Sequence, residues 1–264
     1  INNGSTDNTS AIVQEVALTS SVAVREVVEE RPGIVFARNR GVREARGEWI
    51  ASFDDDQLAD PQWINELLRA AEEKRCRCVG GAVKLKLPPG ERRELSPICR
   101  MLLGETVGME TPMRYTTRIT PGTGNLMVHR TVFEQIGAFD EAFQQRGEDT
   151  DLFLRMHAAG IGAWFTPTAI VHHVIPAERL SSDYLLKVSG LMSQGIARQE
   201  RDSVGRWMYP AYWLARLGQT ALSITPRLVW AWGLNKRENL LGYRCRLKIA
   251  RGYLREGFPL LFQT

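Results

Sequence analysis

Three consecutive carboxylates, Asp54, Asp55 and Asp56, are the residues of this sequence whose types and spacing point most directly to chemistry. They follow directly on Trp49 to Phe53, a short and mostly apolar run that is typical of a buried strand. Adjacent carboxylates repel one another, so a site that keeps them ionised usually supplies a cation. Hard oxygen ligands suit Mg²⁺ or Mn²⁺, above all where substrate phosphates complete the coordination shell. The pattern therefore predicts a divalent-cation site at the carboxyl end of a strand in an open α/β sheet.

The simpler interpretation is that the three carboxylates form a solvated loop or cap the next helix. That helix already has a start signal, because Asp60 and Pro61 are a favoured N-cap and first-turn pair. Apolar residues at helical spacing then follow, in a helix predicted to run to residue 74. The acid triplet is therefore not needed for capping, and metal binding is the favoured interpretation.

A second group of carboxylates, Glu148, Asp149 and Asp151, stands at the start of a helix predicted from residue 147. The helix dipole stabilises acidic residues in a first turn, so simple capping explains them. A carboxylate held rigidly at a helix start can also face a cleft and act as a general base. On the residues alone, capping is the favoured interpretation.

Two further patterns are ambiguous in the same way. Residues 120–125 form a turn rich in glycine, which either lets the backbone approach a ligand or simply reverses the chain. His172 and His173 end two short strands predicted within residues 161–174, around Pro167. Neighbouring side chains of a strand point to opposite faces, so at most one histidine faces a given site. A lone histidine is more often packed or exposed, but near a carboxylate cluster it becomes a third metal ligand.

Alternating strands and helices give the expected order of elements. In the first half of the chain, patterning predicts a turn at 2–7 with a helix after it, a strand at 22–28, a helix at 33–45 and a strand at 78–87. An irregular insertion is expected at 88–115. It is followed by a strand at 126–128, a helix at 132–136 ended by Gly137, and an amphipathic helix at 178–203.

The 264 residues are 44% apolar and 24% charged, which is ordinary for a globular chain that buries one good core. The four cysteines show neither zinc-ligand spacing nor a disulfide framework, so we expect a reducing, cytoplasmic compartment.

Charge is divided unequally: residues 1–178 hold 20 Lys and Arg against 25 Asp and Glu, whereas residues 179–264 hold 14 Lys and Arg against 5 Asp and Glu. This split from −5 to +9 predicts a domain boundary near residue 178 and an anionic surface as partner of the basic part.

The basic part contains a segment rich in tryptophan. Residues 207–232 hold four of the seven tryptophans. Arg216 and Arg227 are the only fully charged residues in this segment. These arginines and the prolines argue against a clean spanning helix. Together with the basic, amphipathic residues that follow, 207–257 is typical of an interfacial anchor at a membrane surface. The alternative is a helical hairpin packed on the main domain or on another chain. The aromatic residues lie in apolar runs, which favours lipid over nucleic acid.

Six short motifs occur in a characteristic order: Asn-Asn-Gly-Ser-Thr-Asp from residue 2, Ala-Arg-Asn-Arg-Gly from 37, Phe-Asp-Asp-Asp from 53, Gly-Thr-Gly-Asn from 122, Gly-Glu-Asp-Thr-Asp from 147 and Val-His-His from 171. Over residues 1–176 the series resembles glycosyltransferase family 2, a GT-A type group. The resemblance implies a Rossmann-like mixed sheet with helices on both faces and a divalent cation, Mn²⁺ or Mg²⁺. It also implies an inverting transfer of sugar from a nucleotide-diphosphate sugar to a hydroxyl acceptor.

The resemblance also carries roles for individual residues. It implies that Asp149 of the Glu148-Asp149 motif is the catalytic base, that Asp56 and either His172 or His173 bind the metal, and that Asp7, Arg38, Asp54, Asp55, Gly124, Asn125 and Glu148 line the donor site. The basic, tryptophan-rich part hints at a glycan or lipid-linked acceptor from cell-envelope or polysaccharide synthesis, at the inner face of the membrane.

Two departures from the family pattern matter. No first strand and helix precede Ile1, so the sequence is expected to be N-terminally truncated, and Asn2 stands where an aspartate is usual. The main alternative is a non-catalytic nucleotide-sugar binding protein docked at a membrane. A metal-dependent phosphoryl-transfer enzyme is disfavoured, because the sequence has no Gly-x-x-x-x-Gly-Lys-Ser/Thr loop.

Overall fold

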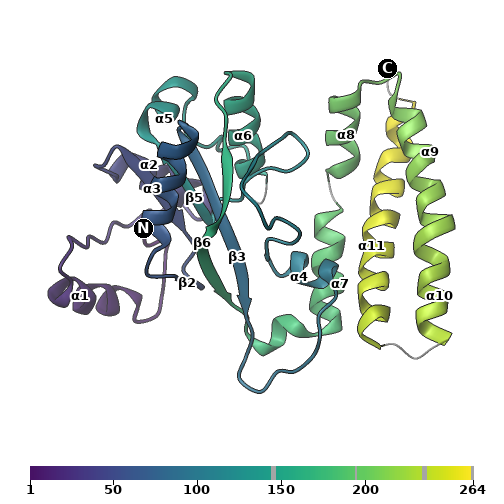
Figure 1. Cartoon of the computed structure of the whole chain (residues 1–264), viewed down its shortest axis with the longest axis horizontal. Helices are drawn as coiled ribbons and strands as arrows, with labels where there is room; N and C mark the ends of the chain where they lie inside the picture. The colour runs from purple at the N-terminus through teal and green to yellow at the C-terminus, as the bar shows by residue number, and fades with distance from the viewer. Residues whose placement is uncertain (144–146, 194, 234–236, 263–264) are drawn as a thin grey trace. The chain divides into compact units, whose positions relative to one another are not determined.

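The computed structural model describes residues 1–143, 147–193, 195–233 and 237–262 (Figure 1). The chain forms two compact units, the first made of residues 1–82 and 109–171 and the second of residues 83–108 and 172–264. The boundary near residue 178 stays a prediction, since the compact units divide the chain at other points.

The first unit contains most of the strands. Its elements are α1 (Thr9–Thr19), α2 (Ile34–Glu44), β1 (Trp49–Phe53), β2 (Gln57–Ala59), α3 (Trp63–Lys74), β4 (Met113–Arg114), β5 (Asn125–His129), α5 (Arg130–Ile136) and α6 (Glu148–Ala158), with the first parts of β3 (Cys78–Lys86) and β6 (Trp164–Val174). Within the described residues, six strands form one sheet in the order β1-β5-β3-β6-β2, and β4 pairs with β6.

The register of β5 places the two loops that matter most. β5 runs antiparallel to both β1 and β3, so β1 and β3 point the same way. Phe53 at the end of β1 lies opposite Asn125 at the start of β5. Asp54 directly follows β1, and Gly124 directly precedes β5. The acid triplet and the glycine-rich turn therefore meet at one edge of the sheet.

Alternation along the strands distributes the apolar side chains to two faces. Val79 and Met127 pack with α3, whereas Cys78, Leu126 and Val128 join a cluster that includes side chains of α2, α5 and α6. The expected mixed sheet with helices on both faces is confirmed. The strand at 49–53 was expected to be buried, but each residue of β1 is partly or fully exposed, because β1 stands at the end of the strand order among the described strands.

The second unit is mainly helical. It contains α4 (Pro97–Leu102), a short 3₁₀ turn η1 (Ala177–Leu180), α7 (Ser182–Met192), α8 (Ile196–Val204), α9 (Tyr209–Gln219), a π-helical turn η2 (Thr220–Ile224), α10 (Thr225–Gly233) and α11 (Arg237–Leu260). α11 packs against α7 and α8 on one side and against α9 and α10 on the other (Figure 1).

A proline explains why α9 and α10 are joined by a π-helical turn. Pro226 has no amide hydrogen, and its ring crowds the carbonyl four residues earlier, at Leu222. The wider π turn at residues 220–224 accommodates this position without ending the helix. Among the helices of the described residues, none is both long enough and apolar enough to cross a membrane.

Three expected elements differ from those observed. The predicted strand at 22–28 is reduced to one bridge between Val28 and Asn2. The two strands expected around Pro167 are a single strand, β6, that runs through the proline. The helix expected at 178–203 is divided into α7 and α8, because Gly195 adopts φ 81°, a left-handed conformation that begins a new helix. The insertion at 88–115 contains α4 and β4 within otherwise irregular chain.

Candidate functional site

The loop after β1 is fitted closely against the glycine-rich turn. A side-chain carbon at Gly124 would overlap Asp54 Oδ2 and would lie 2.9 Å from Gln57 Nε2. Gln57 is buried, and its Oε1 lies 3.5 Å from the backbone N–H of Asp54. Only glycine allows this approach, so the close-approach interpretation of the turn is the one the geometry supports.

Arg38 of α2 joins the acid triplet to the Glu148-Asp149 motif. Its Nη1 forms an ion pair with Glu148 Oε1, and its Nη2 lies 3.8 Å from Asp54 Oδ1. The side chain of Arg38 is 15% exposed and that of Glu148 is 7% exposed, so water screens their attraction only weakly. One guanidinium therefore holds carboxylates from the loop after β1 and from the start of α6 in a single place.

Two buried oxygens in this region have no hydrogen-bond partner among the residues that the structure describes. They are Oε2 of Glu148 and Oγ1 of Thr123, and Thr123 stands between the two glycines of the turn. Buried acceptors and hydroxyls without partners are rare in folded proteins, because each costs about 1–3 kcal/mol. Both atoms are available to a polar ligand, which fits a site that is completed by its substrate.

Asp149 is held at the start of α6 by its own neighbour. Its Oδ1 accepts a hydrogen bond of 2.7 Å from the backbone N–H of Thr150, and its Oδ2 lies 3.9 Å from where a side-chain carbon of Gly122 would be. Gly147, just before the helix, has φ 102°, which a residue with a side chain rarely adopts. The carboxylate is thus fixed in orientation and turned toward the glycine-rich turn.

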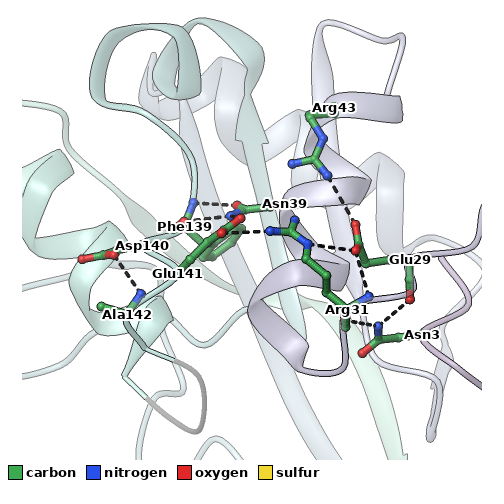
Figure 2. Close-up of polar contacts among 9 residues, drawn as sticks. All are labelled: Asn3, Glu29, Arg31, Asn39, Arg43, Phe139, Asp140, Glu141 and Ala142. Carbon is green, nitrogen blue, oxygen red and sulfur yellow. Dashed lines mark hydrogen bonds and ion pairs between the residues drawn. The ribbon is translucent and has the colours of Figure 1, made fainter.

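Asn39, the residue after Arg38, anchors the segment that leads into α6. Its Nδ2 donates to the carbonyl of Phe139, and its Oδ1 accepts from the backbone N–H of Phe139, each at 2.9 Å (Figure 2). Nδ2 also lies 3.4 Å from Oε1 of Glu141, whose Oε2 accepts from Arg31 at 3.0 Å. Successive residues of α2 therefore hold the segment before α6 and the first residue of α6.

Glu29 is the centre of the neighbouring charge network (Figure 2). Its Oε1 accepts 3.1 Å hydrogen bonds from both Nε and the backbone N–H of Arg31, and its Oε2 lies 3.4 Å from Nη2 of Arg43. The hydrogen bonds from Arg31, first from its side chain and then from its backbone, hold the pKa of Glu29 below the usual value. Asn3 extends the network by donating to the carbonyls of Glu29 and Arg31 at 2.8 and 2.7 Å.

The side chain of Asn125, expected at the donor, is instead committed to the sheet. It is 3% exposed; its Nδ2 donates to the carbonyls of Ala82 and Ala169, and its Oδ1 accepts from Trp63 Nε1 at 2.7 Å. A side chain at Gly81 would overlap this amide. These contacts support a structural role for the Asn125 side chain, and its donor contact stays a prediction.

Asp7 and His173 have partners of their own. Oδ1 of Asp7 accepts from the backbone N–H and the hydroxyl of Thr9, which lowers the pKa of Asp7. Nδ1 of His173 lies 2.8 Å from the carbonyl of Leu103 and Nε2 lies 3.2 Å from Arg179 Nη1, all within the second unit. Because both ring nitrogens of His173 are engaged, His172 is the better candidate ligand. All three assignments stay predictions.

The acid triplet fits a cation held together with substrate phosphates. In the described part of the chain, no group of three or more His, Cys, Asp or Glu side chains is arranged to hold a metal ion alone. Mg²⁺ or Mn²⁺ bound through one or two carboxylates and substrate phosphates needs no such cage. The side chain of Asp54 is 44% exposed, and Asp55 and Asp56 reach solvent as well, so the carboxylates are open to such a complex.

Sequence reasoning missed Gln57, Gly81 and Asn39. Asn39 carried a usable signal, because it follows Val35 by one helical turn and therefore lies on the buried face of α2. A polar residue on a buried face must find partners, which predicts a long-range hydrogen bond. Gln57 and Gly81 carried no local signal, since their importance comes from strands that are distant in sequence.

Comparison with known proteins shows the family and the fold of the chain. Residues 1–137 match Glycosyl transferase family 2. The chain is 30% identical over 158 residues to O-antigen biosynthesis protein RfbC of Myxococcus xanthus, which covers 53% of this chain and 12% of that protein. It is 30% identical over 157 residues to succinoglycan biosynthesis protein ExoM of Rhizobium meliloti. This match covers 58% of this chain and 48% of that protein. The chain thus spans less than half the length of these relatives.

Two solved structures share the fold. A mannosyltransferase from Pyrobaculum calidifontis, in complex with GDP-Man and Mn²⁺, has a TM-score of 0.58 and 16% identity over 96% of this chain and 76% of its own. GalNAc-T7 with UDP, GalNAc and Mn²⁺ has a TM-score of 0.52 and 16% identity. This match covers 76% of this chain and 44% of the GalNAc-T7 chain. The fold is that of the GT-A type proteins. Within that class, the chain belongs to glycosyltransferase family 2.

Proposed function

We propose that the chain carries the donor-binding and catalytic part of an inverting glycosyltransferase. It would move a sugar from a nucleotide-diphosphate sugar to a hydroxyl acceptor. The observation that carries this proposal is Arg38, which pairs with both Asp54 and Glu148 and so brings the acid triplet to the helix that carries the base. A single small ligand can then contact both groups.

The relatives indicate the process, and the structural neighbours indicate the donor. RfbC and ExoM are named for O-antigen and succinoglycan biosynthesis, so we infer a role in the synthesis of a cell-envelope or extracellular polysaccharide. The structural neighbours were solved with UDP or GDP-Man, so we infer a nucleoside-diphosphate donor for this chain.

Asp149 is the proposed base. The hydroxyl of the acceptor attacks the anomeric carbon, and its proton passes to Oδ2 of Asp149 as the new carbon–oxygen bond forms. The bond from the anomeric carbon to the nucleoside diphosphate breaks at the same time, and the diphosphate leaves with the electron pair. Attack from the face opposite the leaving group inverts the anomeric carbon. The hydrogen bond from Thr150 to Oδ1 orients Asp149 for this transfer.

Asp56 would hold the divalent cation together with the donor's phosphates, and Asp54 and Asp55 would contact the sugar and ribose side. A bound Mg²⁺ or Mn²⁺ supplies charge neutralisation for the departing diphosphate. Arg38 adds a fixed positive charge beside Asp54 and pairs with the carboxylate of Glu148 in its buried position. Glycine at positions 122 and 124 lets the turn lie close to Asp149 and Asp54, where the donor would bind.

The second unit presents an apolar surface suited to peripheral membrane contact at the cytoplasmic face. Along α9, η2 and α10 the exposed large side chains are Leu214 (60%), Leu217 (41%), Leu222 (82%), Val229 (59%), Trp230 (57%) and Trp232 (73%). Exposed tryptophans beside basic residues are typical of segments that lie in a membrane interface. This contact would bring the enzyme to a lipid-linked acceptor.

Titration of UDP-sugars and GDP-sugars, with and without Mn²⁺, tests the function when it is combined with an acceptor screen. The expected result is binding that is tighter with Mn²⁺, together with sugar transfer and an inverted product by NMR. Binding without transfer to any acceptor would support the non-catalytic alternative. A chain that binds no nucleotide sugar would contradict both.

A further inference from the structure

One side of α11 carries four cationic side chains. Arg244, Lys248, Arg251 and Arg255 are spaced by four, three and four residues, which places them along one face of the helix. All four are exposed. With a rise of about 1.5 Å per residue, the row extends over roughly 16 Å, which is longer than a single phosphate group.

These residues line an open groove between α11 and α7. The opposite wall is formed by Leu186, Gly190 and Ser193, and the groove has a volume of about 450 Å³. The two helices approach closely here, because a side-chain carbon at Gly190 would lie 3.2 Å from Lys248 Cε and one at Gly252 would overlap Ser193 Oγ. The small residues of α7 thus allow the two helices to pack closely beside the cationic row.

The positive charge of the groove is not neutralised within the described part of the chain. None of the four cations forms an ion pair there, whereas Arg216 of the same unit pairs with Glu200 at 3.0 Å and Arg93 pairs with Glu91 at 2.6 Å. Four neighbouring like charges repel one another, so an anion in the groove would be stabilised by all of them.

We propose that the groove between α7 and α11 binds the phosphate groups of an elongated anion, either a soluble oligophosphate or the headgroups of anionic lipid. Guanidinium groups match phosphate oxygens in bidentate geometry, and Lys248 adds a point charge. Leu186 and Leu247 provide an apolar lining for the uncharged part of the ligand. The site does not depend on the proposed sugar transfer, since it lies wholly within the second unit.

Pyrophosphate binding to the full chain is the first test, in the variant Lys248→Ala/Arg251→Ala and in the control Arg198→Ala/Arg246→Ala. The control removes the same charge from exposed positions of the same unit that do not line the groove. At about 1 kcal/mol per cation, the groove variant is expected to bind about thirtyfold more weakly, and the control to bind almost as the wild type does. Pyrophosphate held in the donor site would not depend on Lys248 or Arg251.

Vesicle flotation is the second test and identifies the source of the phosphate. Vesicles of phosphatidylcholine alone are compared with vesicles containing phosphatidylglycerol, at low and high salt. Extra binding to the anionic vesicles that is lost in the groove variant and at high salt indicates lipid headgroups. Groove-dependent binding of pyrophosphate alone indicates a soluble ligand.

The proposal is overturned if neither probe binds in a groove-dependent way, or if the control variant loses as much binding as the groove variant. Thermal melts of both variants check that the fold is intact. A lysine–arginine exchange, Lys248→Arg/Arg251→Lys, keeps the charge and should restore most of the binding even if the alanine variant is destabilised.

Discussion

Asn39 and Phe139 exchange two hydrogen bonds, each 2.9 Å long, although 100 residues of sequence separate them. The amide of Asn39 thereby satisfies both backbone groups of Phe139, as a neighbouring strand would. Because Arg38 holds Glu148 from the same turn of α2, this helix fixes the approach to α6 at two points. The position of the proposed base thus depends on a helix far from it in sequence.

Asn39→Ala is expected to destabilise the first unit and to slow transfer. It leaves the buried N–H and C=O of Phe139 without partners, at a cost of about 2–4 kcal/mol for the two groups. Urea unfolding would show the loss, and kcat would fall more than nucleotide affinity because the start of α6 is displaced. Asn65→Ala, an exposed asparagine of α3, is the control and should change stability by less than about 0.5 kcal/mol. Equal stability of the two variants would contradict the anchoring role.

Asp149→Asn is expected to reduce transfer by at least about a hundredfold, because the amide cannot take the acceptor's proton. Nucleotide affinity, measured by titration, should change little. Asp151→Asn on the same helix is the control, since it removes only a pair with Arg155 in which both side chains are partly exposed. Normal transfer by Asp149→Asn would mean that another group is the base.

Arg38→Ala is expected to be strongly destabilising, since it leaves Glu148 buried without its cation. Breaking such a pair costs about 3 kcal/mol, and adding Glu148→Gln should recover part of the loss. The control is Arg40→Ala, which removes a more exposed pair with Glu44 and should cost no more than about 1 kcal/mol. Wild type, Arg38→Ala, Glu148→Gln and the variant with both changes form a double-mutant cycle in denaturant unfolding. An additive cycle would show that the two residues are not coupled.

Gly124→Ala is expected to weaken donor binding, because its methyl group would displace Asp54 and crowd Gln57. The affinity for the nucleotide sugar should fall by at least about tenfold, which corresponds to about 1.4 kcal/mol. Gly218→Ala in α9 is the control, since nothing lies within 4 Å of the new methyl group and alanine favours the helix by about 1 kcal/mol. Unchanged affinity in Gly124→Ala would show that the turn does not border the donor.

Glu29 is expected to add acid sensitivity to the first unit. Its pKa in the folded chain lies below the usual value because of the hydrogen bonds from Arg31. Its contribution is therefore complete above the unfolded pKa of about 4.5 and is lost as the pH falls through the folded pKa. Thermal melts from pH 7 to pH 3 should show wild type and Glu29→Gln converging at low pH. Glu30→Gln, at an exposed position, should stay parallel to wild type; a Glu29→Gln curve parallel to wild type would contradict the prediction.

The sequence alone determined the elements whose signals are local. The strand before the acid triplet, the helix starting after Asp60, and the stop at Gly137 were all predictable, because apolar periodicity, caps and glycine act within a few residues. Its motif order also identified the family, which the match over residues 1–137 confirms. The strand at 22–28 was wrong because alternation alone does not provide a partner strand.

Only the tertiary structure decided which residues meet. The register of β1 against β5 brings Asp54 to Gly124, and the placement of α2 brings Arg38 to both Asp54 and Glu148. The same packing places the Asn125 side chain inside the sheet rather than at the turn's surface. Such contacts join segments separated by up to about a hundred residues, and their geometry follows from how the helices bury the two faces of the sheet.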